Sequence, residues 1–283
     1  MTGERFLMIN ADDFGMCHST NQAIRTLLLE ESITSASIMM TCPWVLEAAS
    51  FVRQYPQMDV GVHITHTSEW EHYKWGPLNT ALSTLTDEFG HFPQDTASVI
   101  AKADPDELRE EAVAQIELAI KMGVDPMNID NHMGSLNHVP EILLELCETY
   151  RLPLRYPKFV NPNVNLHHDE QLVRKAEEKG ILLPDFIEFL PFFSPDGDGE
   201  GELTYSFTKD AAVKCIQELK PGITELLFHP SLDTEELKAI TNSWNVRRFE
   251  FDVFRDEDIV KLLQKEEIRL ITWRDLRNKQ RAQ

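Results

Sequence analysis

The junction where the first apolar run meets two acidic residues constrains the fold of this chain more than any other stretch. Residues 6–9 are all apolar, and the chain then continues as Asn10-Ala11-Asp12-Asp13-Phe14-Gly15. An uninterrupted apolar run is typical of a strand covered on both faces, as in a parallel sheet, and ligands of such sheets bind at the carboxyl ends of the strands. We therefore expect a functional site at Asp12 and Asp13.

The two carboxylates can share one site only if the chain turns near 13–15, because neighbouring residues of a strand point to opposite faces. Gly15 permits such a turn. One carboxylate could then bind a metal ion while the other stays free. The alternative is that Asp12 or Asp13 caps the helix that begins near Cys17, which would leave the other acid unexplained.

Strand-like and helix-like segments alternate along the rest of the chain, which favours a parallel sheet. No internal repeat or clear domain boundary interrupts the alternation, so we expect one domain over residues 1–283 with an α/β fold, a closed or nearly closed barrel. The periodicity predicts further strands at 35–40, 58–63, 127–130, 152–157, 186–190, 223–228 and 268–271, helices at 18–31, 43–52, 105–123, 139–150, 168–180, 208–219 and 255–266, and a flexible loop at 194–204.

Histidines stand where three other predicted strands end, namely His63, His132 and His229. Aligned parallel strands would bring them to the same edge as Asp12 and Asp13. A single histidine is more often an ordinary surface or core residue. One carboxylate and two imidazoles, from Asp13, His63 and His132, could nevertheless surround a divalent cation and leave the remaining positions to water or substrate.

The segment 64–93 shows little regular periodicity and is too long for an ordinary connection, so we expect it to cover a substrate. His66 and His138 are the best candidates among the remaining histidines. His138 follows His132 by six residues, a spacing that does not place the two on one helical face, which favours capping or a substrate contact over metal binding.

The composition argues against some partners. The formal net charge is −20, from 47 acidic and 27 basic residues, which disfavours nucleic acids and anionic membranes.

The four cysteines lie far apart without a C-x-x-C spacing and are expected to be reduced thiols. The amino terminus passes directly into the first strand without a signal peptide, and no apolar run approaches the roughly 18 residues of a membrane span. We therefore expect a cytoplasmic protein.

Five motifs together resemble the YdjC-like family of carbohydrate deacetylases, in order and spacing along almost the whole chain. The first of them is the most specific, whereas a His-Pro pair alone would carry no weight. The motifs are Asn10-Ala11-Asp12-Asp13-Phe14-Gly15, Gly61-Val62-His63-Ile64-Thr65, Asp130-Asn131-His132, Leu154-Arg155-Tyr156-Pro157 and Phe228-His229-Pro230.

The resemblance implies a distorted (β/α) barrel similar to that of NodB-type deacetylases. It also implies an enzyme that removes acetyl groups from N-acetylated sugars or oligosaccharides of the chitooligosaccharide kind. Asp13, His63 and His132 then match the metal ligands. Asp12 matches the general base and His229 the general acid.

Three further positions are open to more than one interpretation. Arg155 matches the arginine expected to hydrogen-bond the base, with a surface ion pair as the alternative. Glu250, in Arg247-Arg248-Phe249-Glu250, is expected either close to the site or as a solvated helix residue. The family often has a second histidine two residues after the first one of the third motif, whereas this chain has Gly134, so local substrate contacts are expected to differ.

The implied reaction is hydrolysis of an acetamide, in which the metal polarises the carbonyl and a bound water, Asp12 accepts a proton, and His229 protonates the departing amine. Mg and Zn are the favoured metals, although the ligands do not fix the choice. Trp70 and Trp75 are expected either to stack on sugar faces or to form the core of the covering segment.

Two other functions remain as alternatives. One is a metal-dependent hydrolase of another amide or ester, and the other is a sugar-binding protein without turnover. The presence of both Asp12 and His229 argues against the second, because binding alone needs neither. The oligomeric state is open, with a homodimer as one option.

Overall fold

Seven parallel strands form one sheet in the part of the chain that the computed structural model describes, residues 3–160, 168–192 and 203–283. Their order is β4-β3-β2-β1-β6-β5, and β7 pairs with the beginning of β1. All these pairs are parallel, which confirms the predicted α/β class. The strands are β1 Arg5–Phe14, β2 Ser35–Ile38, β3 Val60–Ile64, β4 Ile129–Asn131, β5 Phe186–Phe189, β6 Gly222–Phe228 and β7 Arg269–Leu270.

Both faces of β1 are covered, which explains its continuous apolar run. Leu7, Ile9 and Ala11 belong to the large core shared with the surrounding helices. Met8 and Asn10 alternate with them and point to the other face, inside the curved sheet, where Met8 packs in a separate cluster. The inner face of β1 thus changes from apolar to polar towards its carboxyl end, where the site is expected.

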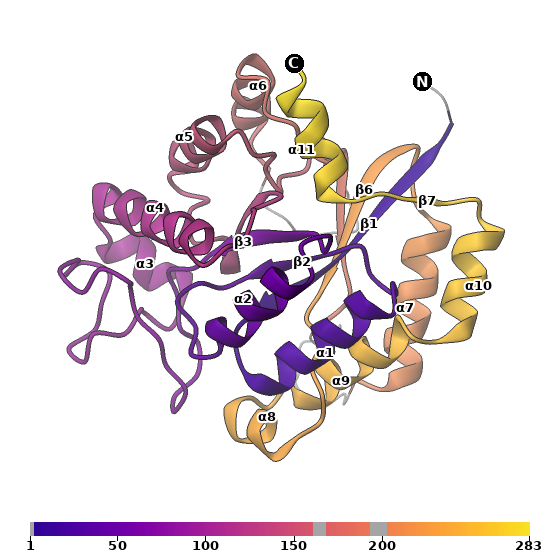
Figure 1. Cartoon of the computed structure of the whole chain (residues 1–283), viewed down its shortest axis with the longest axis horizontal. Coiled ribbons are helices and arrows are strands. Elements are labelled where there is room, and N and C mark those ends of the chain that lie inside the picture. The colour runs from indigo at the N-terminus through magenta and orange to yellow at the C-terminus, as the bar shows by residue number, and fades with distance from the viewer. Residues whose placement is uncertain (1–2, 161–167, 193–202) are drawn as a thin grey trace.

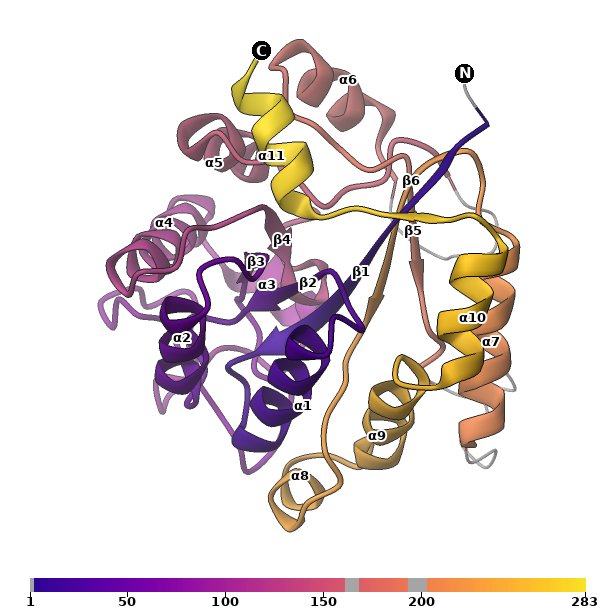
Figure 2. The same cartoon turned by 45° about the vertical axis from the view of Figure 1, so that its right-hand side comes forward.

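Helices surround the sheet on its outer side (Figure 1, Figure 2). Helix α4 begins as predicted, because the side chain of Asp104 accepts a hydrogen bond from the backbone N of Asp106 at 2.8 Å and Pro105 lies in the first turn. The helices are α1 His18–Leu29, α2 Val45–Gln54, α3 Thr96–Lys102, α4 Pro105–Lys121, α5 Pro140–Tyr150, α6 Glu170–Glu178, α7 Tyr205–Gln217, α8 Glu235–Ile240, α9 Trp244–Val253, α10 Glu257–Lys265 and α11 Trp273–Arg281, with the short 3-10 helix η1 at His132–Gly134. Most of the loop expected at 194–204 lies outside the described residues.

Irregular chain, and not a further strand, lies beside β4 where the barrel continues towards β5. The strand predicted at 152–157 is reduced to one parallel bridge between Leu154 and β4. Pro153 and Pro157 carry no backbone N–H, which prevents a continuous ladder. The backbone N of Leu154 donates to the carbonyl of Leu182 at 3.1 Å, in the segment that leads into β5. The barrel is therefore distorted, with a sheet that is regular over only part of its circumference.

Four α-helices in the described part of the chain were not expected from the sequence: α3, α8, α9 and α11. Helix α11 lies beside β1, at the end of the sheet where this strand begins, in both views (Figure 1, Figure 2). Its Trp273 is fully buried against Met8, and the indole Nε1 donates to Glu225 Oε1 at 3.1 Å. This helix therefore closes the end of the barrel opposite the site, and α9 supplies two residues to the site itself.

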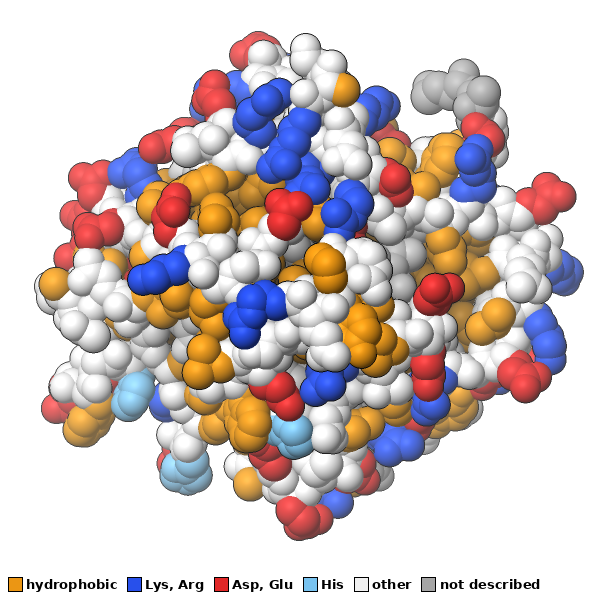
Figure 3. Space-filling model, viewed as in Figure 1, with side chains coloured by type: hydrophobic (Ala, Val, Ile, Leu, Met, Phe, Trp, Pro, Cys, Tyr) orange, Lys and Arg blue, Asp and Glu red, His pale blue; other side chains and the backbone are white. Residues whose placement is uncertain are grey.

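Lys and Arg side chains gather over α11 on the face shown in Figure 3. Arg274 and Arg277 of α11 hold the helix to the rest of the fold. Arg277 Nη1 lies 2.7 Å from Asp125 Oδ1, and Arg274 Nη2 donates to the carbonyl of Pro56 at 3.1 Å. These two arginines therefore have a structural role. Within the described part of the chain, the helices are too short or too polar to cross a membrane.

Candidate active site

Strand β1 contains a bulge between Ala11 and Phe14. Ala11 pairs with Ala36 and Phe14 with Ile38, so β1 advances by three residues where β2 advances by two. Asp13 lies in this bulge with a φ of 67°, a left-handed conformation that Asp adopts more readily than most residues. The bulge re-aims the side chains of the two adjacent acids.

Asp12 and Asp13 consequently face the same imidazole. His63 Nε2 lies 3.9 Å from Asp12 Oδ2 and 3.8 Å from Asp13 Oδ1. The expected turn is confirmed, and it is completed by Gly15 at φ 98°. The capping alternative is wrong, because the N-cap residue of α1 is Cys17 and the backbone N of Ser19 donates to Glu236 Oε2 at 2.9 Å, not to Asp12 or Asp13.

Asp13, His63 and His132 come together as predicted and could hold a metal ion. His132 Nδ1 lies 3.1 Å from His63 Nε2 and 3.6 Å from Asp13 Oδ1, and the third side of this triangle is 3.8 Å. Donor atoms bound to one cation at about 2.1 Å stand roughly 3.0–3.4 Å apart in octahedral or tetrahedral geometry. All three residues are buried, and the triangle is close to the size that a small divalent cation requires.

Carboxylates on the far side of each ring fix which imidazole nitrogens face this triangle. His63 Nδ1 hydrogen-bonds Asp130 Oδ1, and His132 Nε2 lies 3.0 Å from Glu69 Oε1. A carboxylate attracts the ring proton to the nitrogen that it contacts, so in the neutral rings His63 Nε2 and His132 Nδ1 are the nitrogens that carry the lone pairs. A cation bound between them would use both lone pairs, which is the arrangement of a metal centre.

Arg247 holds Asp13, the third candidate ligand, as the carboxylates hold the two histidines. Its Nη1 donates to Asp13 Oδ2 at 2.8 Å, while Asp13 Oδ1 is buried without a hydrogen-bond partner. Burial raises the pKa of Asp13, but Arg247 and the nearby imidazoles outweigh it and hold that pKa well below its usual range. Burial lowers the pKa of His63, whereas Asp130 and Asp12 raise it, and the net effect is a pKa of about 9. The orphaned carboxylate oxygen is thus a charged acceptor that faces the two imidazoles.

The contribution of Arg247 was not foreseen. The guanidinium also lies over two aromatic rings, 5.7 Å from the centroid of Trp70 and 5.2 Å from that of Phe192. The spacing Arg247-x-x-Glu250 places both residues on one face of a helix, which was the signal available in the sequence. The helix itself, α9, had not been predicted.

Arg155 is a buried hub of ion pairs. Its Nη1 and Nη2 donate to the two carboxylate oxygens of Asp12 at 2.8 and 2.9 Å, and its Nε donates to Glu225 at 2.9 Å. Nη2 also lies 3.0 Å from Asp130 Oδ2. The alternative of a surface ion pair is wrong, because the Arg155 side chain is only 7% exposed.

The carboxylates around Arg155 respond to it differently. Burial raises the pKa of Glu225 to about 7, although Arg155 acts in the opposite direction. Burial also raises the pKa of Asp130, but Arg155 and His63 outweigh it, and the net shift is downward. The cluster therefore depends on one guanidinium to balance several buried acids.

His229 lines the same cavity as Asp12 and Arg155. Its backbone N donates to Glu250 Oε2 at 2.8 Å. Removal from bulk water lowers the pKa of His229 to about 4, although Asp13 and Asp12 act against this. The interpretation of Glu250 as a solvated residue is wrong, because it is fully buried and burial raises its pKa to about 8.

The remaining candidates do not line the cavity. His66 is fully buried, with Nε2 3.2 Å from the carbonyl of Leu108, and burial lowers its pKa to about 4. His138 is exposed and is not among the residues that line the cavity. Trp75 is buried, with its ring centroid 5.5 Å from that of Trp70, and neither ring lines the cavity. Of the two roles expected for these tryptophans, the structure favours the core of the covering segment.

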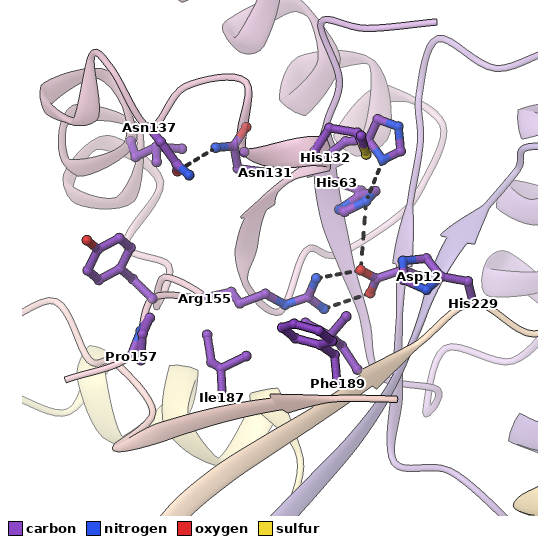
Figure 4. Close-up of a pocket in the computed structure, with 15 residues that line it drawn as sticks. Asp12, His63, Asn131, His132, Asn137, Arg155, Pro157, Ile187, Phe189 and His229 are labelled. Carbon is purple, nitrogen blue, oxygen red and sulfur yellow. Dashed lines mark hydrogen bonds and ion pairs between the residues drawn. The ribbon is translucent and has the colours of Figure 1, made fainter. Parts of the chain in front are cut away.

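A cavity of about 370 Å³ opens beside the candidate metal ligands. In Figure 4, Ile187 and Phe189 form one wall and the side-chain amides of Asn131 and Asn137 lie opposite. Asp12, Arg155 and His229 lie between these walls. An apolar wall facing hydrogen-bonding amides suits a ligand with both apolar and polar faces, and a sugar ring has this character.

The fold and the site define a class: a distorted parallel barrel with a buried Asp-His-His cluster at the carboxyl ends of its strands. The chain belongs to the YdjC-like protein family, whose model matches residues 6–265. This confirms the resemblance drawn from the motifs.

Individual relatives resemble the chain over almost its full length. A carbohydrate deacetylase from Thermus thermophilus is 30% identical over 278 residues, which cover 97% of this chain and 95% of that protein. A carbohydrate deacetylase from Thermoanaerobacter pseudethanolicus is 26% identical and covers 95% and 98%. Among solved structures, a protein from Enterococcus faecalis V583 described as a cellobiose-phosphate cleavage protein gives a TM-score of 0.77 at 24% identity, covering 96% and 99%. This last similarity shows the fold alone.

Proposed function

We propose that this protein is a metal-dependent carbohydrate deacetylase, which removes acetyl groups from N-acetylated sugars or oligosaccharides. The observation that carries the proposal is the convergence of Asp13, His63 and His132 beside a cavity that also holds Asp12 and His229. The family and the names of the relatives support the sugar substrate.

Mg or Zn is the metal that we propose. Two imidazoles and one carboxylate are the donor set of catalytic zinc sites, and water in the other positions would also suit magnesium. When bound, the cation supplies Lewis-acid polarisation of the acetamide carbonyl and acidifies a water molecule. Asp13, His63 and His132 would hold it.

Asp12 is the base in this proposal, and Arg155 positions it. The two hydrogen bonds from Arg155 fix the plane of the Asp12 carboxylate in a buried site. A carboxylate held in this way in the cavity can accept the proton of the attacking water.

His229 is the acid that protonates the departing amine. Its pKa of about 4 makes it neutral near pH 7 in the resting protein. The proton that it donates must therefore arrive during turnover, and Asp12, which takes a proton from water in the same cavity, is the group that can supply it. Loss of either residue should then block the same proton path.

The test is acetate release from N-acetylglucosamine oligomers by the wild type and the variants Asp12→Asn and His229→Ala. Both variants should lose activity by about 100-fold or more while they still bind Zn²⁺. Wild-type turnover in both variants would reject the assigned roles. Wild-type hydrolysis of other amides or esters but not of these oligomers would favour the alternative hydrolase.

We further propose that the protein acts in the cytoplasm. Cys17, Cys42 and Cys147 are buried free thiols, and Cys215 is a half-buried one. Unpaired thiols in the core are typical of proteins that fold in a reducing compartment.

A further inference from the structure

Glu69 lies against the candidate metal centre but belongs to none of the motifs that mark the site. It comes from the irregular segment between β3 and α3, and its Oε1 lies 3.0 Å from His132 Nε2. We propose that Glu69 is a positioning residue, which holds His132 in the tautomer and ring orientation that present Nδ1 to the metal. This inference rests on the metal centre of the proposed function.

Only one tautomer of His132 suits the site. Nδ1 is the atom that lies 3.1 Å from His63 Nε2 and 3.6 Å from Asp13 Oδ1, so the lone pair is needed there and the proton belongs on Nε2. Glu69 Oε1 accepts a hydrogen bond from this Nε2–H group. Without this acceptor, the ring could place its proton on Nδ1, where a cation cannot bind.

Glu69 is itself held in place before any ligand binds. Thr67 Oγ1 donates to Glu69 Oε1, and the carbonyl of Thr67 accepts from the indole Nε1 of Trp75 at 2.8 Å. The backbone N of Ser68 donates to the carbonyl of Pro93 at 2.8 Å, which ties the two ends of the segment together. The buried Trp75 thus anchors the turn that carries Glu69, and Thr67 gives the carboxylate a second hydrogen bond besides the one to His132.

The other histidine of the candidate metal centre also has a carboxylate behind its ring, from a different segment of the chain. His63 Nδ1 hydrogen-bonds Asp130, which is buried on β4 and also contacts Arg155. Asp130 belongs to a regular strand, whereas Glu69 belongs to a segment without regular structure. Each histidine ligand therefore has its own carboxylate, and the covering segment contributes one of the two.

The test compares Glu69→Gln with Glu71→Gln, a matched control from the same segment. Glu71 is 85% exposed, and its charge is removed in the same way. Zn²⁺ affinity is measured by calorimetric titration of chelator-treated protein. Loss of a carboxylate behind a metal-binding histidine weakens metal affinity by about 10–100-fold. We expect this loss in the first variant and wild-type affinity in the control.

A second readout follows the ring itself. In the Zn²⁺-loaded wild type, the His132 Nε2 proton should give a downfield NMR signal that exchanges slowly with water. It should move upfield and exchange faster in Glu69→Gln but not in Glu71→Gln. Thr67→Val keeps the carboxylate and removes only the hydroxyl that holds it, so it should bind Zn²⁺ more weakly than the wild type and Glu71→Gln. It serves as the test if Glu69→Gln does not fold, and Zn²⁺ affinity equal to that of the control would then overturn the proposal.

The outcomes separate this proposal from the one on which it rests. If wild-type protein binds no Zn²⁺, both fail. If wild type binds Zn²⁺ and Glu69→Gln binds it equally tightly with an unchanged Nε2 proton signal, the role of Glu69 is overturned and the deacetylase proposal stands.

Discussion

Replacement of Arg155 by methionine should destabilise this protein more than the loss of any surface ion pair. The guanidinium lies within 3.0 Å of oxygens from Asp12, Asp130 and Glu225, all of them buried. Methionine keeps most of the side-chain volume but removes the charge and the donors. Breaking a buried pair from one side costs about 3–5 kcal/mol, because the partner remains as an uncompensated buried charge. Here three acids lose one partner, so we expect at least the upper end of that range.

The loss should grow with pH. Arg155 lowers the pKa of both Asp130 and Glu225, against the effect of burial. Without it, the folded-state pKa of Glu225 rises further above its unfolded value, and the pKa of Asp130 loses the effect that holds it below its own. A group whose folded pKa is raised contributes stability below its unfolded pKa and loses it as the pH rises towards the folded one. In the folded wild type the pKa of Glu225 is about 7. The stability of the variant should therefore be closest to that of the wild type near pH 5 and furthest below it above pH 7.

Urea unfolding of both proteins at pH 5, 6, 7 and 8 measures this difference. Arg255→Met is the matched control, because Arg255 pairs with Glu30 where both side chains are 41% exposed. Exposed pairs contribute about 0–1 kcal/mol, so the control should change little and without a strong dependence on pH. A loss below about 1 kcal/mol in Arg155→Met, or one that stays constant from pH 5 to 8, would refute the reasoning.

Three further predictions concern other parts of the site. Between the ordinary pKa of Glu250, 4.5, and its folded-state value of about 8, the folded wild type keeps a proton on Glu250 that the unfolded chain releases, so the wild type loses stability as the pH rises. Glu250→Gln carries no such proton and should gain stability relative to the wild type by about 1.4 kcal/mol per pH unit over this window, as measured by urea unfolding. Gly134→Ala should destabilise more than Gly90→Ala: both glycines have positive φ, but a Cβ at Gly134 would lie 2.5 Å from Asn137 Nδ2 and one at Gly90 would meet nothing within 4 Å. Thermal unfolding compares the two, and equal losses would show that the contact with Asn137 is unimportant. Zn²⁺ at 100 times its Kd should stabilise wild type by about 2.7 kcal/mol and leave Asp13→Asn unchanged, so an equal gain in that variant would place the ion elsewhere.

Only part of the molecule could be predicted from local pattern. The alternation of strands and helices identified most of the sheet, because each strand must bury apolar residues and each helix repeats its apolar face. It failed at 152–157, where two prolines remove the donors of a ladder, and at α9, which is short and carries charged residues among its aromatic ones. Such segments take their conformation from the elements against which they pack.

The sequence by itself determined that acids and histidines stand at the ends of parallel strands, since apolar strands and the polar residues that end them are local features. It thereby identified Asp13, His63 and His132 as a set. The tertiary structure alone decided how each of them is held. Arg247 reaches Asp13 across 234 positions of the chain and Glu69 reaches His132 across 63. The reason is physical: a charged side chain is equally compatible with solvent and with a buried partner, and only the packing of distant segments selects between them.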